Sequence, residues 1–174
     1  MAERSLVIDH LKLSYEGLFN AAELYNVISS FFYEKGWDWL EKFNLEQVTP
    51  TGKNIQLILE PWKSVSDFYK ISVAIKIHLT DVKDVEVEQE GKTLRLNHGQ
   101  VKITFDGYVL SDRSGEWTSK PFYWFLTLIA QKYFFRDRFA RMEAWITSDV
   151  EDLHERIKTY LNVFKYTYRE KIKE

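Results

Sequence analysis

Strict alternation of apolar and polar side chains marks the segment YKISVAIKIHLT, from Tyr69 to Thr80. A period of two is typical of a β-strand that buries one face and leaves the other in water. The apolar residues share one face, and the other face carries Lys70, Ser72, Ala74, Lys76, His78 and Thr80. Antiparallel sheets tolerate one polar face, whereas parallel sheets are covered on both. The segment therefore predicts an antiparallel sheet.

Three further strands are expected before this segment. Leu6–Tyr15 alternates as well, with a phase slip at Asp9-His10 that predicts a bulge. The turn residues at 50–52 separate two short alternating runs, at 45–49 and 55–59. The N-terminal part of the chain thus contributes strands to the same sheet.

The segment is followed by more strand-like sequence. Val85–Leu96 is expected to form a hairpin around Gly91. Turns are expected at 97–99 and at 106–107, with a strand over 101–105 between them. Because no helical crossover separates these strands, they favour an antiparallel meander over βαβ units.

Helical spacing appears near the N-terminus. Asn20 and Glu23 have the spacing of a capping box, and apolar residues follow every three or four positions. Gly36 stands where a helix C-cap belongs. The pattern predicts an amphipathic helix over residues 21–35.

The C-terminal part is expected to hold two more helices. Residues 121–135 are rich in aromatic and aliphatic side chains and begin with a proline, which favours the first helical turn. A last strand is expected over Phe139–Ile146. Ser148 and Glu151 then repeat the capping-box spacing before an apolar stripe, which predicts a helix over 149–165.

Composition excludes several classes of protein. The 174 residues include 6 Trp, 10 Tyr and 12 Phe but no Cys, and the net charge is −2. The lack of cysteine excludes disulfide scaffolds, thiolate metal sites and cysteine nucleophiles. The near-neutral charge argues against a dedicated nucleic-acid-binding domain. The length fits one domain over 1–174, with a polar tail at 165–174 that we expect to fray.

Targeting signals are not evident in the sequence. The first residues show no basic segment followed by a long apolar run. The densest apolar run, Phe122–Ala130, is much shorter than the about 20 residues that span a bilayer. We therefore expect a cytoplasmic protein without a membrane span.

The order of strand, helix, long meander and C-terminal helix resembles the helix-grip architecture of the START/SRPBCC superfamily. This resemblance implies an α+β fold in which an antiparallel meander curves around a long C-terminal helix, often with an apolar cavity between them. The predicted helix at 121–135 would be an addition to that plan, and a second early helix is not evident. Residues 80–87, 105–108 and 120–123 also resemble a family of small archaeal proteins, which brings no activity to transfer.

No catalytic or metal-binding motif is present. The four histidines, His10, His78, His98 and His154, fall in separate predicted elements without ligand spacing. The acidic run from Asp81 to Glu90 lacks a calcium-loop pattern and is typical of a solvated strand face. We expect no catalytic residue, no metal and no cofactor, and an enzyme is the least favoured class.

The aromatic surplus suggests two kinds of binding. The first hypothesis is a non-catalytic domain that holds an apolar or aromatic ligand between sheet and C-terminal helix. Its candidate lining residues are Trp117, Phe122, Trp124, Phe125, Trp145 and Tyr160. The second is a protein-interaction or scaffold protein, or a homodimer, that uses exposed aromatic rings and charged patches. An ordinary aromatic core would explain the same composition.

A third hypothesis concerns residues 132–141, where basic and aromatic side chains alternate. Arginines that contact phosphates and rings that stack on bases are typical of RNA or single-stranded nucleic-acid binding. The candidate contacts are Lys132, Arg136, Arg138 and Arg141. The alternative is the C-terminal end of a helix, where cations complement the helix dipole.

Overall fold

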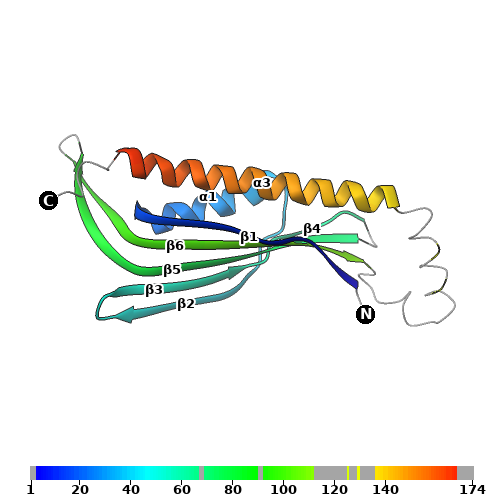
Figure 1. The fold of residues 1–174 in the computed structure, drawn as a ribbon, viewed down its shortest axis with the longest axis horizontal. Helices are drawn as coiled ribbons and strands as arrows, with labels where there is room; N and C mark the ends of the chain where they lie inside the picture. The colour runs from blue at the N-terminus through cyan, green and yellow to red at the C-terminus, as the bar shows by residue number, and fades with distance from the viewer. Residues whose placement is uncertain are drawn as a thin grey trace.

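The computed structural model describes residues 3–66, 69–89, 92–111 and 136–167, together with Phe125 and Ile129 (Figure 1). Within them the fold is α+β, with an open antiparallel sheet and helices packed on one of its faces. The strands are β1 (Glu3–Phe19), β2 (Glu41–Thr49), β3 (Gly52–Leu59), β4 (Trp62–Ser64), β5 (Tyr69–Gln89) and β6 (Lys92–Ser111). The helices are α1 (Ala21–Glu34) and α3 (Arg136–Thr167).

The strand order β1-β6-β5-β3-β2 confirms the predicted antiparallel meander. The short strand β4 pairs with the first residues of β5, and β3 pairs with the following ones. The N-terminal strand β1 completes the sheet by pairing with β6, the last strand in the described chain. Within the described residues, β1 and β2 therefore stand at the two ends of this strand order, each with one edge unpaired.

Local signals placed α1 correctly. The side chain of Asn20 accepts a hydrogen bond from the Glu23 backbone N–H at 3.2 Å, as a helix N-cap does. Gly36 has a φ of 69° just beyond the helix, a conformation that glycine adopts at little cost. The predicted helix over 21–35 is confirmed to within one residue.

The predicted bulge at Asp9-His10 is also confirmed. The register of β1 against β6 shifts between Ile8 and Leu11, and His10 has a φ of 52°. A second bulge lies in β5, where Asp81 has a φ of 53° and its backbone N–H is held by the Asn54 side chain at 3.0 Å. Both bulges let long strands bend (Figure 1).

The turns predicted at 97–99 and 106–107 are wrong, because both segments lie inside β6. A side chain at Gly99 would place its Cβ 2.9 Å from the Thr80 carbonyl oxygen, so the missing side chain makes room for the bulge of β5. Asp106 and Gly107 are buried in the sheet. Gly99 and Gly107, which resembled turn residues, instead allow neighbouring elements to approach β6 closely.

The strand predicted over Phe139–Ile146 is wrong, and Ser148 does not cap a helix. Both lie within α3, which begins at Arg136. Met142 and Ile146 continue the buried stripe of the helix at the same spacing as Val150, so one amphipathic helix includes all three. Of the helix predicted near 121–135, the described residues Phe125 and Ile129 are helical and the others lie outside the described part.

The contact between α3 and the sheet is filled by the protein's own side chains. Ile146, Val150, Leu153, Ile157 and Leu161 of α3 are at most 1% exposed. They belong to one apolar cluster with the inward-facing residues of β5 and β6. Of the described helices, none is long and apolar enough to cross a membrane.

Gly107 sets how closely α3 approaches the sheet. A Cβ at this position would lie 2.8 Å from Cγ2 of Ile146 and 3.2 Å from Cβ of Ile8. We therefore expect Gly107→Ala to lower the free energy of unfolding by about 1–3 kcal/mol, because it overpacks this contact. Urea unfolding would measure the change. The double variant Gly107→Ala, Ile146→Ala should lose less stability than the sum of the losses of the two single variants. A loss equal to that sum would contradict the contact.

Candidate interaction surfaces

Three of the six predicted lining residues of an apolar site are described by the structure. Trp117, Phe122 and Trp124 lie outside the described residues, and Phe125 is 56% exposed. Trp145 is 40% exposed, with the Lys63 ammonium 4.8 Å from its ring centre. Tyr160 lies 15 residues further along α3, about 22 Å at the rise of an α-helix. The described members therefore do not converge on one pocket.

Tyr160 has a structural role instead. Its hydroxyl group donates to the Asn20 carbonyl oxygen at 3.0 Å and accepts from the Asn20 backbone N–H at 3.3 Å. Burial raises the pKa of this phenol well above its usual value, and the hydrogen bond to Asn20 opposes that rise only in part. The contact fastens the start of α1 to α3.

The predicted basic contacts lie at the beginning of α3. Lys132 lies outside the described residues, and Arg136 is the first residue of the helix. Arg138 and Arg141 are exposed on its first turns. Cations are favoured at the C-terminal end of a helix dipole and not at the N-terminal end. The described part of α3 shows no C-terminal helix end at these arginines, and residues 130–135 lie outside the described part. The dipole explanation and the contact with nucleic acid therefore both stay predictions.

A second buried polar contact joins α1 to α3. Asp149 is 3% exposed and accepts hydrogen bonds from Nζ of Lys35 at 3.0 Å and from Nε1 of Trp37 at 3.2 Å. Lys35 also donates to Asp152 at 3.2 Å. Hydrogen bonds to these carboxylates, that to Asp149 above all, raise the pKa of the Lys35 ammonium. The contact fixes the helices against each other on the inner face of the sheet.

The outer face of the sheet, opposite the helices, contains a buried carboxylate. Asp106 of β6 is 1% exposed, and it accepts from Nζ of Lys76 at 3.0 Å and from the His10 backbone N–H at 2.9 Å. Burial alone would raise the pKa of Asp106, but the hydrogen bonds from Lys76 and His10 outweigh it and hold that pKa below its usual value. The bulge in β1 is what aims the His10 N–H at this carboxylate.

Asp9, His10 and Asp106 together offer three ligand atoms within 4.8 Å of one another. The Lys76 ammonium already lies against Asp106 and balances its charge. The cluster is thus a closed ion-pair network that positions Lys76 and the β1 bulge. Sequence reasoning missed it because Asp106 is followed by glycine and resembled a turn residue, while its partners are distant in the chain.

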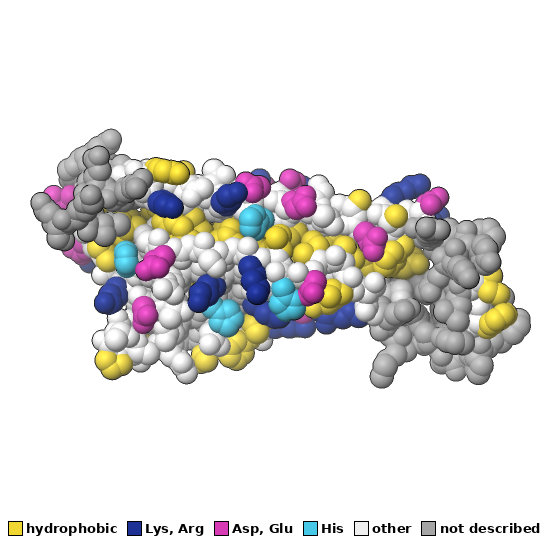
Figure 2. Space-filling view, viewed as in Figure 1, with side chains coloured by type: hydrophobic (Ala, Val, Ile, Leu, Met, Phe, Trp, Pro, Cys, Tyr) yellow, Lys and Arg dark blue, Asp and Glu magenta, His cyan; other side chains and the backbone are white. Residues whose placement is uncertain are grey.

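Cations are concentrated on the middle of this outer face. Lys76 is paired across the ladder with Thr104, and Thr104 with Lys12. In the next row His78 is paired with Lys102, and Lys102 with Ser14. Directly paired residues share a face of the sheet, so these groups form one surface. Figure 2 shows dark blue and cyan side chains gathered over this part of the sheet.

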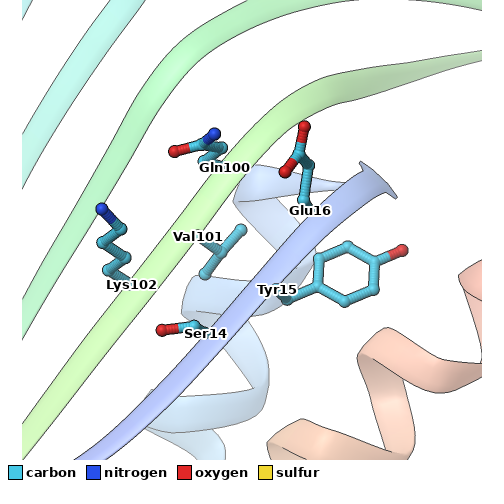
Figure 3. Close-up of a pocket in the computed structure, with 6 residues that line it drawn as sticks. All are labelled: Ser14, Tyr15, Glu16, Gln100, Val101 and Lys102. Atoms are coloured by element: carbon cyan, nitrogen blue, oxygen red, sulfur yellow. The ribbon is translucent and has the colours of Figure 1, made fainter.

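A shallow groove of about 350 Å³ runs beside these cations (Figure 3). It lies between β1 and β6 and is lined by Ser14, Tyr15, Glu16, Gln100, Val101 and Lys102. In Figure 3, Ser14 and Lys102 project to one side of the strands and Tyr15 projects to the other. The groove therefore adjoins the polar groups of the outer face.

The edge strand β2 is the most exposed strand of the described chain and carries three apolar side chains. Eight of its nine residues are exposed, which means that both of its faces meet water. Phe43 is 43% exposed, Leu45 is 37% exposed and Val48 is 78% exposed. In Figure 2 hydrophobic side chains lie along the lower edge of the molecule, where Figure 1 places β2 and β3. No other described strand pairs with the open side of β2.

No family model matches the chain, and no curated protein sequence matches it. The resemblances to the START/SRPBCC superfamily and to small archaeal proteins therefore stay predictions. The surfaces described above are the basis for the functional argument.

The ionised Asp106 should stabilise the fold at neutral pH. Because its pKa is lower in the folded than in the unfolded chain, its contribution is complete above an unfolded pKa of about 4 and is lost as the pH falls through the folded value. We expect Asp106→Asn to cost about 1 kcal/mol at pH 7, a modest value because Lys76 is partly exposed. Urea unfolding at pH 7 and near pH 3 would measure it.

The loss caused by Asp106→Asn should shrink at the acidic pH, because the carboxyl group of the unfolded wild type is protonated there and the stabilisation from the ionised Asp106 falls. Glu151→Gln, at an exposed position of α3, is the matched control and should change stability little at either pH. An equal loss for Asp106→Asn at both pH values would contradict the ion pair.

Proposed function

We propose that the protein is a non-catalytic interaction protein that self-associates through β2. The observation that supports this proposal is the exposure of three apolar side chains, those of Phe43, Leu45 and Val48, on a nine-residue strand at an edge of the described sheet. Every second residue of an edge strand directs its backbone N–H and C=O groups away from the sheet, where an added strand can bind them. The hypothesis of an apolar ligand between sheet and α3 has less support, because side chains fill that contact over the described residues.

The two edges of the sheet differ in a way that favours β2 as the interface. On the outer face, β1 presents Lys12, Ser14 and Glu16, polar residues of the kind that protect an edge from association. At the corresponding place, β2 presents Phe43 and Leu45. An edge with exposed aromatic and aliphatic side chains is expected to be covered in solution.

A second copy of the chain fits this edge. If a two-fold axis passes through Asn44 perpendicular to the sheet, two β2 strands pair in antiparallel orientation. Phe43 of each copy then lies opposite Leu45 of the other, so the axis creates the same apolar pair twice. Cross-strand pairs of this kind contribute about 0.2–1 kcal/mol each. The pairing also joins the two sheets into one, with all helices on the same side.

The first test is the mass of the full chain in solution, by light scattering after size exclusion. We expect the wild type to be a dimer and the double variant Phe43→Lys, Leu45→Lys to be a monomer, because charge on both copies would meet in the interface. The matched control is Leu6→Lys, which changes a 48% exposed leucine on the other edge strand and should leave the dimer intact. A monomeric wild type would contradict the proposal.

The second test addresses the register. The chain has no cysteine, so a single introduced cysteine can form a disulfide only with another copy. Opposed residues of an antiparallel pair have Cα atoms about 4.5–5.5 Å apart, which suits a disulfide. We expect Asn44→Cys to form a crosslinked dimer under mild oxidation and Val48→Cys to remain uncrosslinked. The same yield from both positions would contradict the axis through Asn44.

A further inference from the structure

The outer face has a set of polar groups that the contact at β2 does not use. Lys12, Lys76, His78 and Lys102 come from three adjacent strands and occupy two successive rows of the ladder. Thr104 and Ser14 lie in the same two rows and add hydroxyl groups. Among the described residues, these two rows contain no carboxylate. The nearest acidic groups are Asp106, which contacts Lys76 from the adjoining row, and Glu16, which lies beside Ser14 in the groove.

The three lysines are not equivalent. Lys76 is held by Asp106 at 3.0 Å, which neutralises that carboxylate and fixes the ammonium group. Lys12 and Lys102 are exposed and make no ion pair with any described residue. Three ammonium groups on neighbouring strands, two of them without an ion-pair partner among the described residues, attract anions to this place although the whole chain has a net charge of −2. An anionic oxygen cluster is the complementary ligand.

The groove beside these lysines adds uncharged side chains and one carboxylate to the cationic surface. Lys102 lines the groove together with Ser14, Gln100 and Glu16. Hydroxyl and amide groups can both donate and accept, and the Glu16 carboxylate accepts from hydroxyl groups. A ligand that reaches from the lysines into the groove would thus need an anionic end and a hydroxyl-bearing end.

We propose that the outer face binds a small phosphorylated polyhydroxyl compound, such as a sugar phosphate or the ribose phosphate part of a nucleotide. Its phosphate group lies among Lys12, Lys102 and His78, where lysine acts as a point charge for phosphate. Its hydroxyl groups lie in the groove against Ser14, Gln100 and Glu16. This binding is independent of the association through β2, because it uses other residues and another part of the sheet.

Calorimetric titration of the full chain tests the proposal with four probes: ribose 5-phosphate, ribose, inorganic phosphate and a short single-stranded RNA. We expect ribose 5-phosphate to bind more tightly than ribose or inorganic phosphate, and its affinity to fall as salt is added. Binding of none of the probes would overturn the proposal. RNA bound much more tightly than ribose 5-phosphate would overturn the assignment to a small ligand.

Variants separate the two ends of the site. Lys102→Gln should weaken both ribose 5-phosphate and inorganic phosphate about tenfold, the loss expected for one charge-assisted hydrogen bond. Ser14→Ala should weaken ribose 5-phosphate but leave inorganic phosphate unchanged. Lys83→Gln, an exposed lysine of β5 beyond the bulge, is the matched control and should change neither. Equal losses in Lys83→Gln and Lys102→Gln would overturn the site, and thermal unfolding of each variant would verify that it is folded.

Discussion

The close contact between α3 and the sheet is the constraint on which the rest of the structure depends. One stripe of α3 lies against the inner face of β5, β6 and β1, and Gly107 removes the side chain that would hold the helix away. The contact excludes water from the largest apolar cluster of the described chain. It also determines the arrangement of the surfaces, because every polar group of the strands that cannot lie under the helices must lie on the outer face.

The outer face and the open edge follow from this one-sided cover. Apolar side chains on the inner face of β5 alternate with the lysines and histidine that point outward, so burial on one side places cations together on the other. The hairpin of β2 and β3 extends away from the helices (Figure 1), and β2 remains exposed on both faces. The backbone ladder with β3 and a few exposed side-chain contacts, such as the hydrogen bond from Tyr25 to Glu41, hold β2 in the sheet.

Features that depend on neighbours in the sequence could be predicted. The alternation of apolar and polar residues predicted β5, and the spacing of Asn20 and Glu23 predicted α1. The phase slip at Asp9-His10 predicted the bulge in β1. Features that depend on distant residues could not. Asp106 is buried because His10 and Lys76 satisfy its oxygens, and Gly99 is needed because β5 bulges against it. Likewise, the alternation in β2 does not reveal that this strand will be last in the sheet, so the open edge could be recognised only from the topology.

The pairing of β1 with β6 also bears on how the chain reaches its fold. Glu3 is paired with Ser111 and Phe19 with Asn97, so β1 joins the sheet only by pairing with a strand that is distant in the sequence. Contacts between residues so distant in sequence cost chain entropy before the contacts lower the energy. Folding that depends on such contacts is therefore slow. The hairpins β2–β3 and β5–β6 have a smaller entropy cost, because each joins two strands that are consecutive in the sequence. We therefore expect β1 to pair later than the strands of these hairpins.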